Sequence, residues 1–133
     1  MSVNYLLADF ATRIRNALMV GKLQVTLPHS KLLLGVASVL KEDGWIAAFS
    51  VVSNSNTHKV IELDLKYDEN GDSVIRDIKL ISKPSKREYV PKGKIPKVQS
   101  GFGSCVLSTS LGVLSGRNAR LKGVGGELLL EVA

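Results

Sequence analysis

Residues 101–133 read GFGSCVLSTSLGVLSGRNARLKGVGGELLLEVA, and this stretch sets the architecture of the C-terminal half of the chain. Its short apolar runs predict three strands, at 104–108, 112–114 and 127–132. The polar residues after Ser115 predict one or two turns of helix. The glycines at 123–126 favour a close approach of the backbone, or a turn with positive φ, that presents Glu127. We therefore expect the C-terminal half to be mostly β with one short helix.

The segment before this stretch is basic and rich in proline. It holds six cations, Lys83, Lys86, Arg87, Lys92, Lys94 and Lys97, and three prolines, Pro84, Pro91 and Pro96. Proline interrupts helices and is confined to the edges of sheets, so we expect a fixed, irregular basic arm. Tyr89 lies within the arm. It could offer a stacking platform to an unpaired base or pack at the interface between the two halves, and the sequence leaves both open.

The N-terminal half predicts an α-β-α-β-β order. A first helix is capped by Ser2 or Asn4 and runs to about Val20, and a second lies between Ser30 and Gly44. Strands are expected at 23–27, 45–52 and 60–67, and the Asn70-Gly71 hairpin signal predicts a returning strand at 74–81. We predict a mixed α/β fold of the α+β type in two small subdomains, an N-terminal one at 1–68 and an RNA-binding one at 69–133.

The positive charge is concentrated in the C-terminal part. The chain has a formal net charge of +6. Residues 1–81 hold nine Lys/Arg and nine Asp/Glu, whereas residues 82–133 hold nine Lys/Arg and three acids. A basic half beside a neutral half indicates a polyanion-binding surface, although charge that serves solubility is the simpler alternative. We favour nucleic acid over lipid because the sequence has no long amphipathic basic helix.

Length and composition narrow the class of protein further. The chain has 133 residues, 44% of them hydrophobic, which is enough for a core. The apolar runs are too short to cross a bilayer, and the N-terminus has no basic leader or signal-like stretch. The single cysteine, Cys105, indicates a reducing compartment, either cytoplasm or its organellar equivalent. We expect no membrane association.

The polar motifs favour binding over catalysis. The hydroxyl triplet of Ser108, Thr109 and Ser110 could meet a ribose hydroxyl, a base edge or a phosphate, or it could simply satisfy its own turn. No base lies near it in sequence to activate a hydroxyl. His29 and His58 have no neighbouring Cys or His, so we expect no metal site, no cofactor and no catalytic residue. A small enzyme that uses the glycine turn as a phosphate site is the alternative, but the turn lacks the ending of a nucleotide-binding loop.

Several motifs in register along the chain resemble the family of the eighth small-subunit ribosomal protein, bacterial type. In the C-terminal half they are Ser108-Thr-Ser-x-Gly-Val113, Arg117-x-Ala-Arg120 and Gly123-Val-Gly-Gly-Glu127. Earlier in the chain they are Asp9-x-x-x-Arg-Ile-Arg-Asn-Ala17, Pro28-x-Ser-Lys31, Leu40-Lys-Glu-x-Gly44, Lys83-Pro84 through Tyr89, Ile95-Pro-x-Val98 and Gly101-x-Gly103. The resemblance covers nearly the whole chain.

The resemblance implies a structural protein of the small ribosomal subunit that binds a central-domain helix of 16S-type rRNA and assists assembly. Its implied partners are this rRNA, neighbouring ribosomal proteins and the mRNA of its own operon, which makes a pure mRNA repressor the second alternative. By position, Ser108, Thr109 and Ser110 would contact the minor groove and unpaired bases. The other implied RNA-binding residues are Tyr89 and Glu127 beside the triplet, Lys86 and Arg87 in the arm, and Lys31, Arg13 and Arg15 against the backbone.

The sequence departs in three places from the pattern that this family usually shows. Leu111 stands where a lysine is usual, so one cation beside the triplet is absent. Residues 114–116 replace a common Met-Thr-Asp, which moves the expected helix cap to Ser115. Residues 85–86 replace a pair that often contains glycine, and Lys86 is a candidate to offset the missing cation at Leu111.

Overall fold

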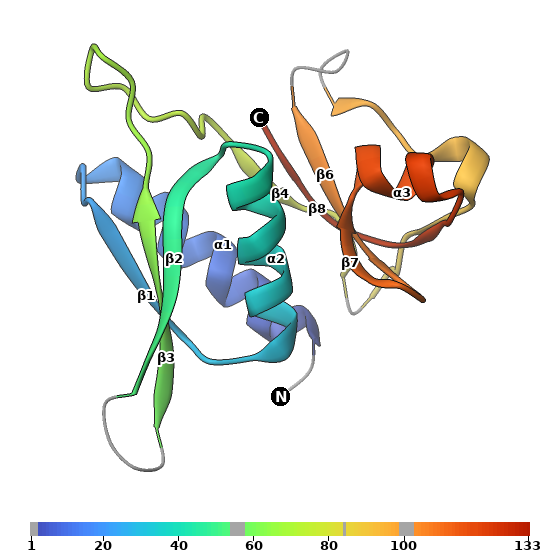
Figure 1. Ribbon diagram of the computed structural model, residues 1–133, viewed down its shortest axis with the longest axis horizontal. Helices are drawn as coiled ribbons and strands as arrows, with labels where there is room; N and C mark the ends of the chain where they lie inside the picture. The colour runs from blue at the N-terminus through green and yellow to red at the C-terminus, as the bar shows by residue number, and fades with distance from the viewer. Residues whose placement is uncertain (1–2, 54–57, 84, 99–102) are drawn as a thin grey trace.

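The computed structural model describes residues 3–53, 58–83, 85–98 and 103–133, which form two bodies lying side by side (Figure 1). The first contains two helices and a three-stranded antiparallel sheet. Its elements are α1 (Val3–Met19), β1 (Gln24–Pro28), α2 (Lys31–Glu42), β2 (Ile46–Ser53) and β3 (Lys59–Leu65), with strand order β1-β3-β2. The second is a five-stranded antiparallel sheet with one helix. Its elements are β4 (Ile78–Leu80), β5 (Tyr89–Val90), the 3-10 helix η1 (Lys92–Lys94), β6 (Ser104–Thr109), β7 (Gly112–Ser115), α3 (Gly116–Lys122) and β8 (Gly126–Val132).

The predicted fold class is confirmed, and local signals account for most of the boundaries. The Ser30 hydroxyl accepts a hydrogen bond from the Leu33 amide at 3.2 Å, which caps α2 as expected. Ser115 caps α3 in the same way, accepting from the Asn118 amide at 3.1 Å. Of the two candidate caps of α1, Asn4 lies inside the helix and Ser2 lies outside the described residues.

The regularly spaced apolar residues of α1 and β3 in the first body are buried in one core. On α1, Leu7, Phe10 and Ile14 recur at helical spacing and are fully buried. On β3, Ile61, Leu63 and Leu65 alternate with more exposed residues and are also buried. This core continues across the boundary between the bodies, because Val106, Leu129, Leu130 and Val132 of the second sheet belong to the same buried cluster. The two bodies therefore share a packed interior.

The expected hairpin at Asn70-Gly71 is wrong. The turn is present, and the Asp68 carboxylate accepts hydrogen bonds from the amides of Asn70 and Asp72 at 2.9 Å each. Beyond an isolated bridge between Tyr67 and Ser73, however, the chain does not pair with β3. Only β4 is a strand, and it pairs with β8 in the second sheet instead. The reason is that β8 offers β4 an edge, where Ile78 becomes buried in the shared core.

Candidate nucleic-acid interface

The register of the second sheet places three predicted site residues side by side. Tyr89 on β5 pairs with Glu127 on β8, and Glu127 pairs with Ser108 on β6. Residues directly opposite each other in an antiparallel sheet point to the same face, with Cβ atoms about 5 Å apart. Three segments that are distant in sequence thus form one line across the sheet, which we call the polar row.

The polar row occupies the face of the sheet opposite α3. Its neighbours in sequence, Leu107 and Leu128, are buried in a small second core with Ala119 of α3. Side chains alternate along a strand, so Ser108 and Glu127 point away from that core. On their own face, Val113 of β7 pairs with Ser108 and extends the line toward α2.

Glu127 is held in place from two sides. Its Oε2 accepts a hydrogen bond from the hydroxyl of Ser82 and lies 3.3 Å from Nη1 of Arg87. The Glu127 side chain is only 13% exposed, whereas that of Arg87 is 41% exposed. The carboxylate therefore orients an arginine at the end of the arm, one of the uses that a lone acid in a basic region can have. Ser82 is fully buried and was not identified from the sequence, where a single serine at the start of the arm carries no signal.

The glycine-rich turn allows the strands around the polar row to approach one another. A Cβ on Gly126 would lie 2.2 Å from the carbonyl oxygen of Ser108, and one on Gly125 would lie 2.3 Å from that of Val90. Both distances are far too short for real atoms. The expectation that these glycines serve close backbone approach is confirmed, and a phosphate loop is not needed to explain them.

Of the three hydroxyls in the triplet, one is used within the protein and two are available to a ligand. The Thr109 hydroxyl donates to the Gly112 carbonyl at 2.7 Å and accepts from the Leu111 amide at 3.1 Å, so it closes its own turn. Within the described residues, the hydroxyls of Ser108 and Ser110 make no hydrogen bond to the protein. Both remain able to donate and accept toward a ligand.

The aromatic ring at the other end of the polar row is open to solvent. Tyr89 is 68% exposed. This exposure does not fit a tyrosine packed between the two bodies, which was the alternative interpretation. It does fit a ring available for stacking beside the cations of the arm.

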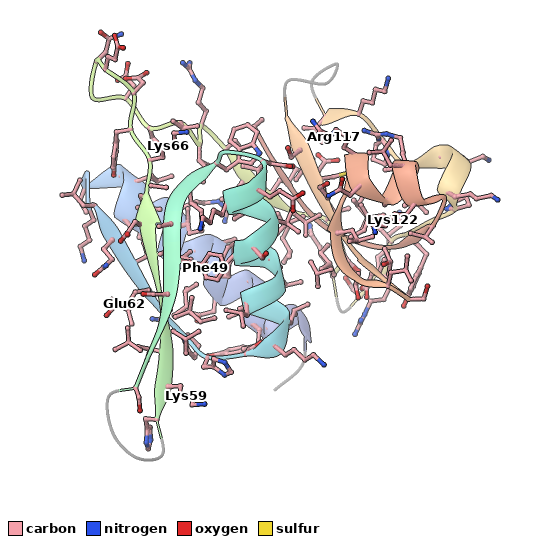
Figure 2. All side chains as sticks on the ribbon, viewed as in Figure 1. Phe49, Lys59, Glu62, Lys66, Arg117 and Lys122 are labelled. Atoms are coloured by element: carbon pink, nitrogen blue, oxygen red, sulfur yellow. The ribbon has the colours of Figure 1, made fainter. Side chains whose placement is uncertain are left out.

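Lys31 of the first body lies next to the polar row. It is the first residue of α2, and it lines a shallow, mostly apolar hollow together with Phe49, Ser108 and Val113. The two bodies touch closely here, because a Cβ on Gly35 would lie 3.0 Å from Val113. Phe49 stands between β2 and α2 (Figure 2). The packing of α2 against β7 thus brings Lys31 to the Ser108 end of the row.

The remaining predicted cations contact residues outside the polar row. Arg13 contacts Asp9 and the Thr26 carbonyl, both at 2.9 Å, and Arg15 donates to the Ile78 carbonyl. Among the described residues, neither arginine contacts the polar row. Lys86 is 80% exposed, with Nζ 3.7 Å from the Glu88 carboxylate.

Three other features of the described residues bear on the class of site. Among them, no set of three or more His, Cys, Asp and Glu side chains could hold a metal ion. Burial raises the pKa of the Cys105 thiol, with Glu131 adding to the shift and Arg120 opposing it, which disfavours the reactive thiolate. No helix in this part of the chain is both long and apolar enough to span a bilayer.

Comparison with known proteins identifies the family of the chain. The model of the family described as Ribosomal protein S8 matches residues 6–133. The chain belongs to this family. Similar proteins include the small ribosomal subunit protein uS8 of Marinobacter nauticus, 46% identical over 132 residues that cover 99% of both chains. The proteins of the same name from Methylococcus capsulatus and Oenococcus oeni are 47% and 43% identical over the same coverage.

Membership of the ribosomal protein S8 family also settles the class of function. The chain is a structural, non-enzymatic component of the ribosome that binds rRNA. The alternative of a small phosphate-binding enzyme is therefore wrong. The family resemblance inferred from the sequence motifs is confirmed.

Proposed function

We propose that the polar row binds a helix in the central domain of the small-subunit rRNA and that this binding assists assembly of the subunit. The observation that carries the proposal is the meeting of Tyr89, Glu127 and Ser108 in one register line on an open sheet face. Binding groups that come from three separate segments and lie on a rigid sheet suit recognition of one defined structure.

The chemistry of the row suits RNA more than a generic polyanion. RNA helices display 2′-hydroxyls and base edges in a wide minor groove that short side chains can reach. The hydroxyls of Ser108 and Ser110 can donate to or accept from these groups. The carboxylate of Glu127 repels phosphate but can accept from a base amino group, so it adds discrimination. Tyr89 offers a surface on which an unpaired base can stack.

The cations around the row supply attraction. Lys31 and Arg87 are exposed beside it and would contact phosphates. Lys86, which is exposed near Glu88, would add a further phosphate contact. Arg13 and Arg15 have N–H donors left beyond their contacts within the protein and would reach the RNA backbone from α1. Because phosphate contacts release counterions, affinity should fall steeply with salt.

The test is a binding titration of a central-domain rRNA helix fragment against a random-sequence RNA duplex at physiological salt. Replacing Ser108 by Val should weaken binding to the helix by about 5- to 150-fold, the usual range for one specific contact of 1–3 kcal/mol. Binding to the random duplex should stay nearly unchanged. The matched control is Ser50→Val on β2, an exposed serine outside the row. Equal affinity of the unmodified chain for both RNAs would contradict the proposal.

The same row would also bind a similar helix in the mRNA of the chain's own operon, because it reads a local structure rather than a long sequence. Because the chain is a component of the ribosome, binding to this mRNA would be an additional role and not its only one. We further propose that the chain acts on cytoplasmic ribosomes, since the similar proteins come from bacteria, with an organellar ribosome as the alternative.

The proposed subdomain boundary lies between residues 68 and 69. It is supported by the pairing of β4 with β8, which assigns residues 78–80 to the second sheet. The core shared by the two bodies means that each subdomain depends on the other for part of its burial. Limited proteolysis should therefore cut the turn at 68–72 without releasing two stable halves.

A further inference from the structure

The basic arm crosses from one face of the second sheet to the other. Arg87 binds Glu127 and so lies on the face of the polar row. After β5 the chain forms η1, and Ile95 is then buried in the small core beneath α3, together with Leu107 and Leu128. The cations of the arm, which the sequence presents as one group, are thereby divided between two opposite faces.

The face that carries α3 includes two strongly basic segments. Its two segments, residues 91–97 and 116–124, contain six cations and no acid. Five of these cations are exposed and, within the described residues, form no ion pair: Lys92, Lys94, Lys97, Arg117 and Lys122. Arg117 and Lys122 both project from α3 (Figure 2).

The sixth cation holds the two segments together. Nη1 of Arg120 lies 3.4 Å from the carbonyl oxygens of both Ile95 and Pro96, so α3 is tied to the chain that follows η1. The exposed cations therefore lie on two segments that are bound to each other, and we call this surface the α3–η1 face. Joining the two segments keeps like charges close together, and these charges repel one another. Binding of an anion would relieve that electrostatic repulsion.

Resting on the proposed function, we propose that the α3–η1 face binds the phosphates of a second RNA segment while the polar row holds the first. The sheet lies between the two surfaces, which therefore face in opposite directions, so a straight RNA helix that lies along one surface does not also cover the other. Lysines act as flexible point charges, and the exposed cations here are mostly lysines, which suits phosphates without regard to sequence. The chain then joins two RNA segments.

The test uses the full chain with the central-domain helix fragment already bound at saturation. A fluorescently labelled 12-base-pair random RNA duplex is added, and its anisotropy is measured at about 0.1 M salt, where charged surfaces still attract strongly. We expect a ternary complex. The triple variant Lys92→Gln, Lys94→Gln and Lys122→Gln should weaken duplex binding by at least tenfold and make its salt slope shallower by about two to three. Its affinity for the helix fragment should change by less than about threefold.

Lys97 and Arg117 are left in place because each lines a hollow that also contains acids, including Glu131 and Glu42 respectively. The matched control is Lys22→Gln, Lys59→Gln and Lys66→Gln, three exposed lysines outside both surfaces. Each triple lowers the formal net charge by three, from +6 to +3. The control should keep the ternary complex.

Three results would overturn the inference. The duplex could fail to join the complex of chain and helix fragment, the two triple variants could weaken it equally, or polyglutamate of equal charge could displace it as well as unlabelled duplex does. Failure of the helix fragment itself to bind specifically would appear in the first titration and would count against the proposed function. The two failures are therefore distinguishable.

Discussion

The N-terminal and C-terminal bodies use their polar side chains in different ways. In the first, arginines close the structure: Arg13 contacts Asp9 and Thr26, and Arg15 contacts the Ile78 carbonyl. In the second, glycines allow the strands to approach, and the hydroxyls of Ser108 and Ser110 are left available. Where the close contacts are made by the backbone, the polar side chains remain available to bind a ligand.

The largest effect should come from breaking that backbone contact. Gly126→Ala would place a Cβ 2.2 Å from the Ser108 carbonyl, so β6 and β8 must separate. We expect a loss of about 3 kcal/mol in the free energy of unfolding, at the upper end for overpacking, and a loss of specific RNA binding. Urea unfolding and the helix titration measure the two effects.

Gly93→Ala is the control for this change, because a Cβ there meets no atom within 4 Å. It should be close to neutral in both measurements. If Gly126→Ala were equally neutral, the view that close backbone approach builds the row would be wrong.

A smaller effect is expected from removing the charge of Glu127. In Glu127→Gln the amide can still accept from Ser82, but Arg87 loses its ionic partner. We expect a loss of about 1–2 kcal/mol in stability, as for a hydrogen bond to a charged group, and about tenfold in affinity for the helix fragment. Glu131→Gln, on the same strand but outside the row, should leave the affinity unchanged. Equal losses in both variants would mean that the effect is one of net charge.

Substitutions of Arg15 and Lys31 compare a cation that stabilises the fold with one that is proposed to bind RNA. Arg15→Gln removes a contact between α1 and β4, so it should lower stability by about 1 kcal/mol and weaken RNA binding only a few-fold. Lys31→Gln should do the reverse, with stability nearly unchanged and a shallower salt slope of binding. Thermal unfolding and titrations at several salt concentrations give both quantities. The opposite pattern would mean that Arg15 on α1 contributes more to RNA binding than Lys31 on α2 does.

The smallest effect should come from adding a cation. Leu111 is 60% exposed beside Ser110 and stands where the resembled family usually has lysine. Leu111→Lys should tighten binding to the helix fragment by about two- to fivefold and steepen the salt slope by about one. Leu121→Lys, which is 77% exposed on α3, should leave that affinity unchanged. An equal gain from both would show that any added charge suffices.

Local patterns were enough to predict most elements. Alternation along β3, the serine caps of α2 and α3, and the short apolar runs of the C-terminal half each depend on neighbouring residues alone. What sequence could not supply depends on partners far along the chain. The pairing of β4 with β8 is one case, because it requires an edge that exists only once the second sheet has formed.

The candidate site shows the same division. Residue types and family motifs identified Tyr89, Ser108 and Glu127, but their meeting in one line is a property of register. Thr109 and Ser82 show the limit more sharply. Thr109 closes its own turn, which is the alternative that the sequence left open for the whole triplet. Ser82 anchors Glu127 from within the fold, a role for which the sequence carries no signal.

The contact between Gly35 and Val113 joins the two bodies next to two of the predicted RNA-binding residues. It presses α2 against β7 where Lys31 and Ser108 line one hollow. Val113 also packs against the core that the two bodies share, which adds to the contact between them. We expect the spacing between the Lys31 ammonium group and the Ser108 hydroxyl to vary little as a result. If these groups contact a phosphate and the minor groove as proposed, a helix of the wrong width would satisfy one contact and miss the other, and rigidity would help to select the RNA.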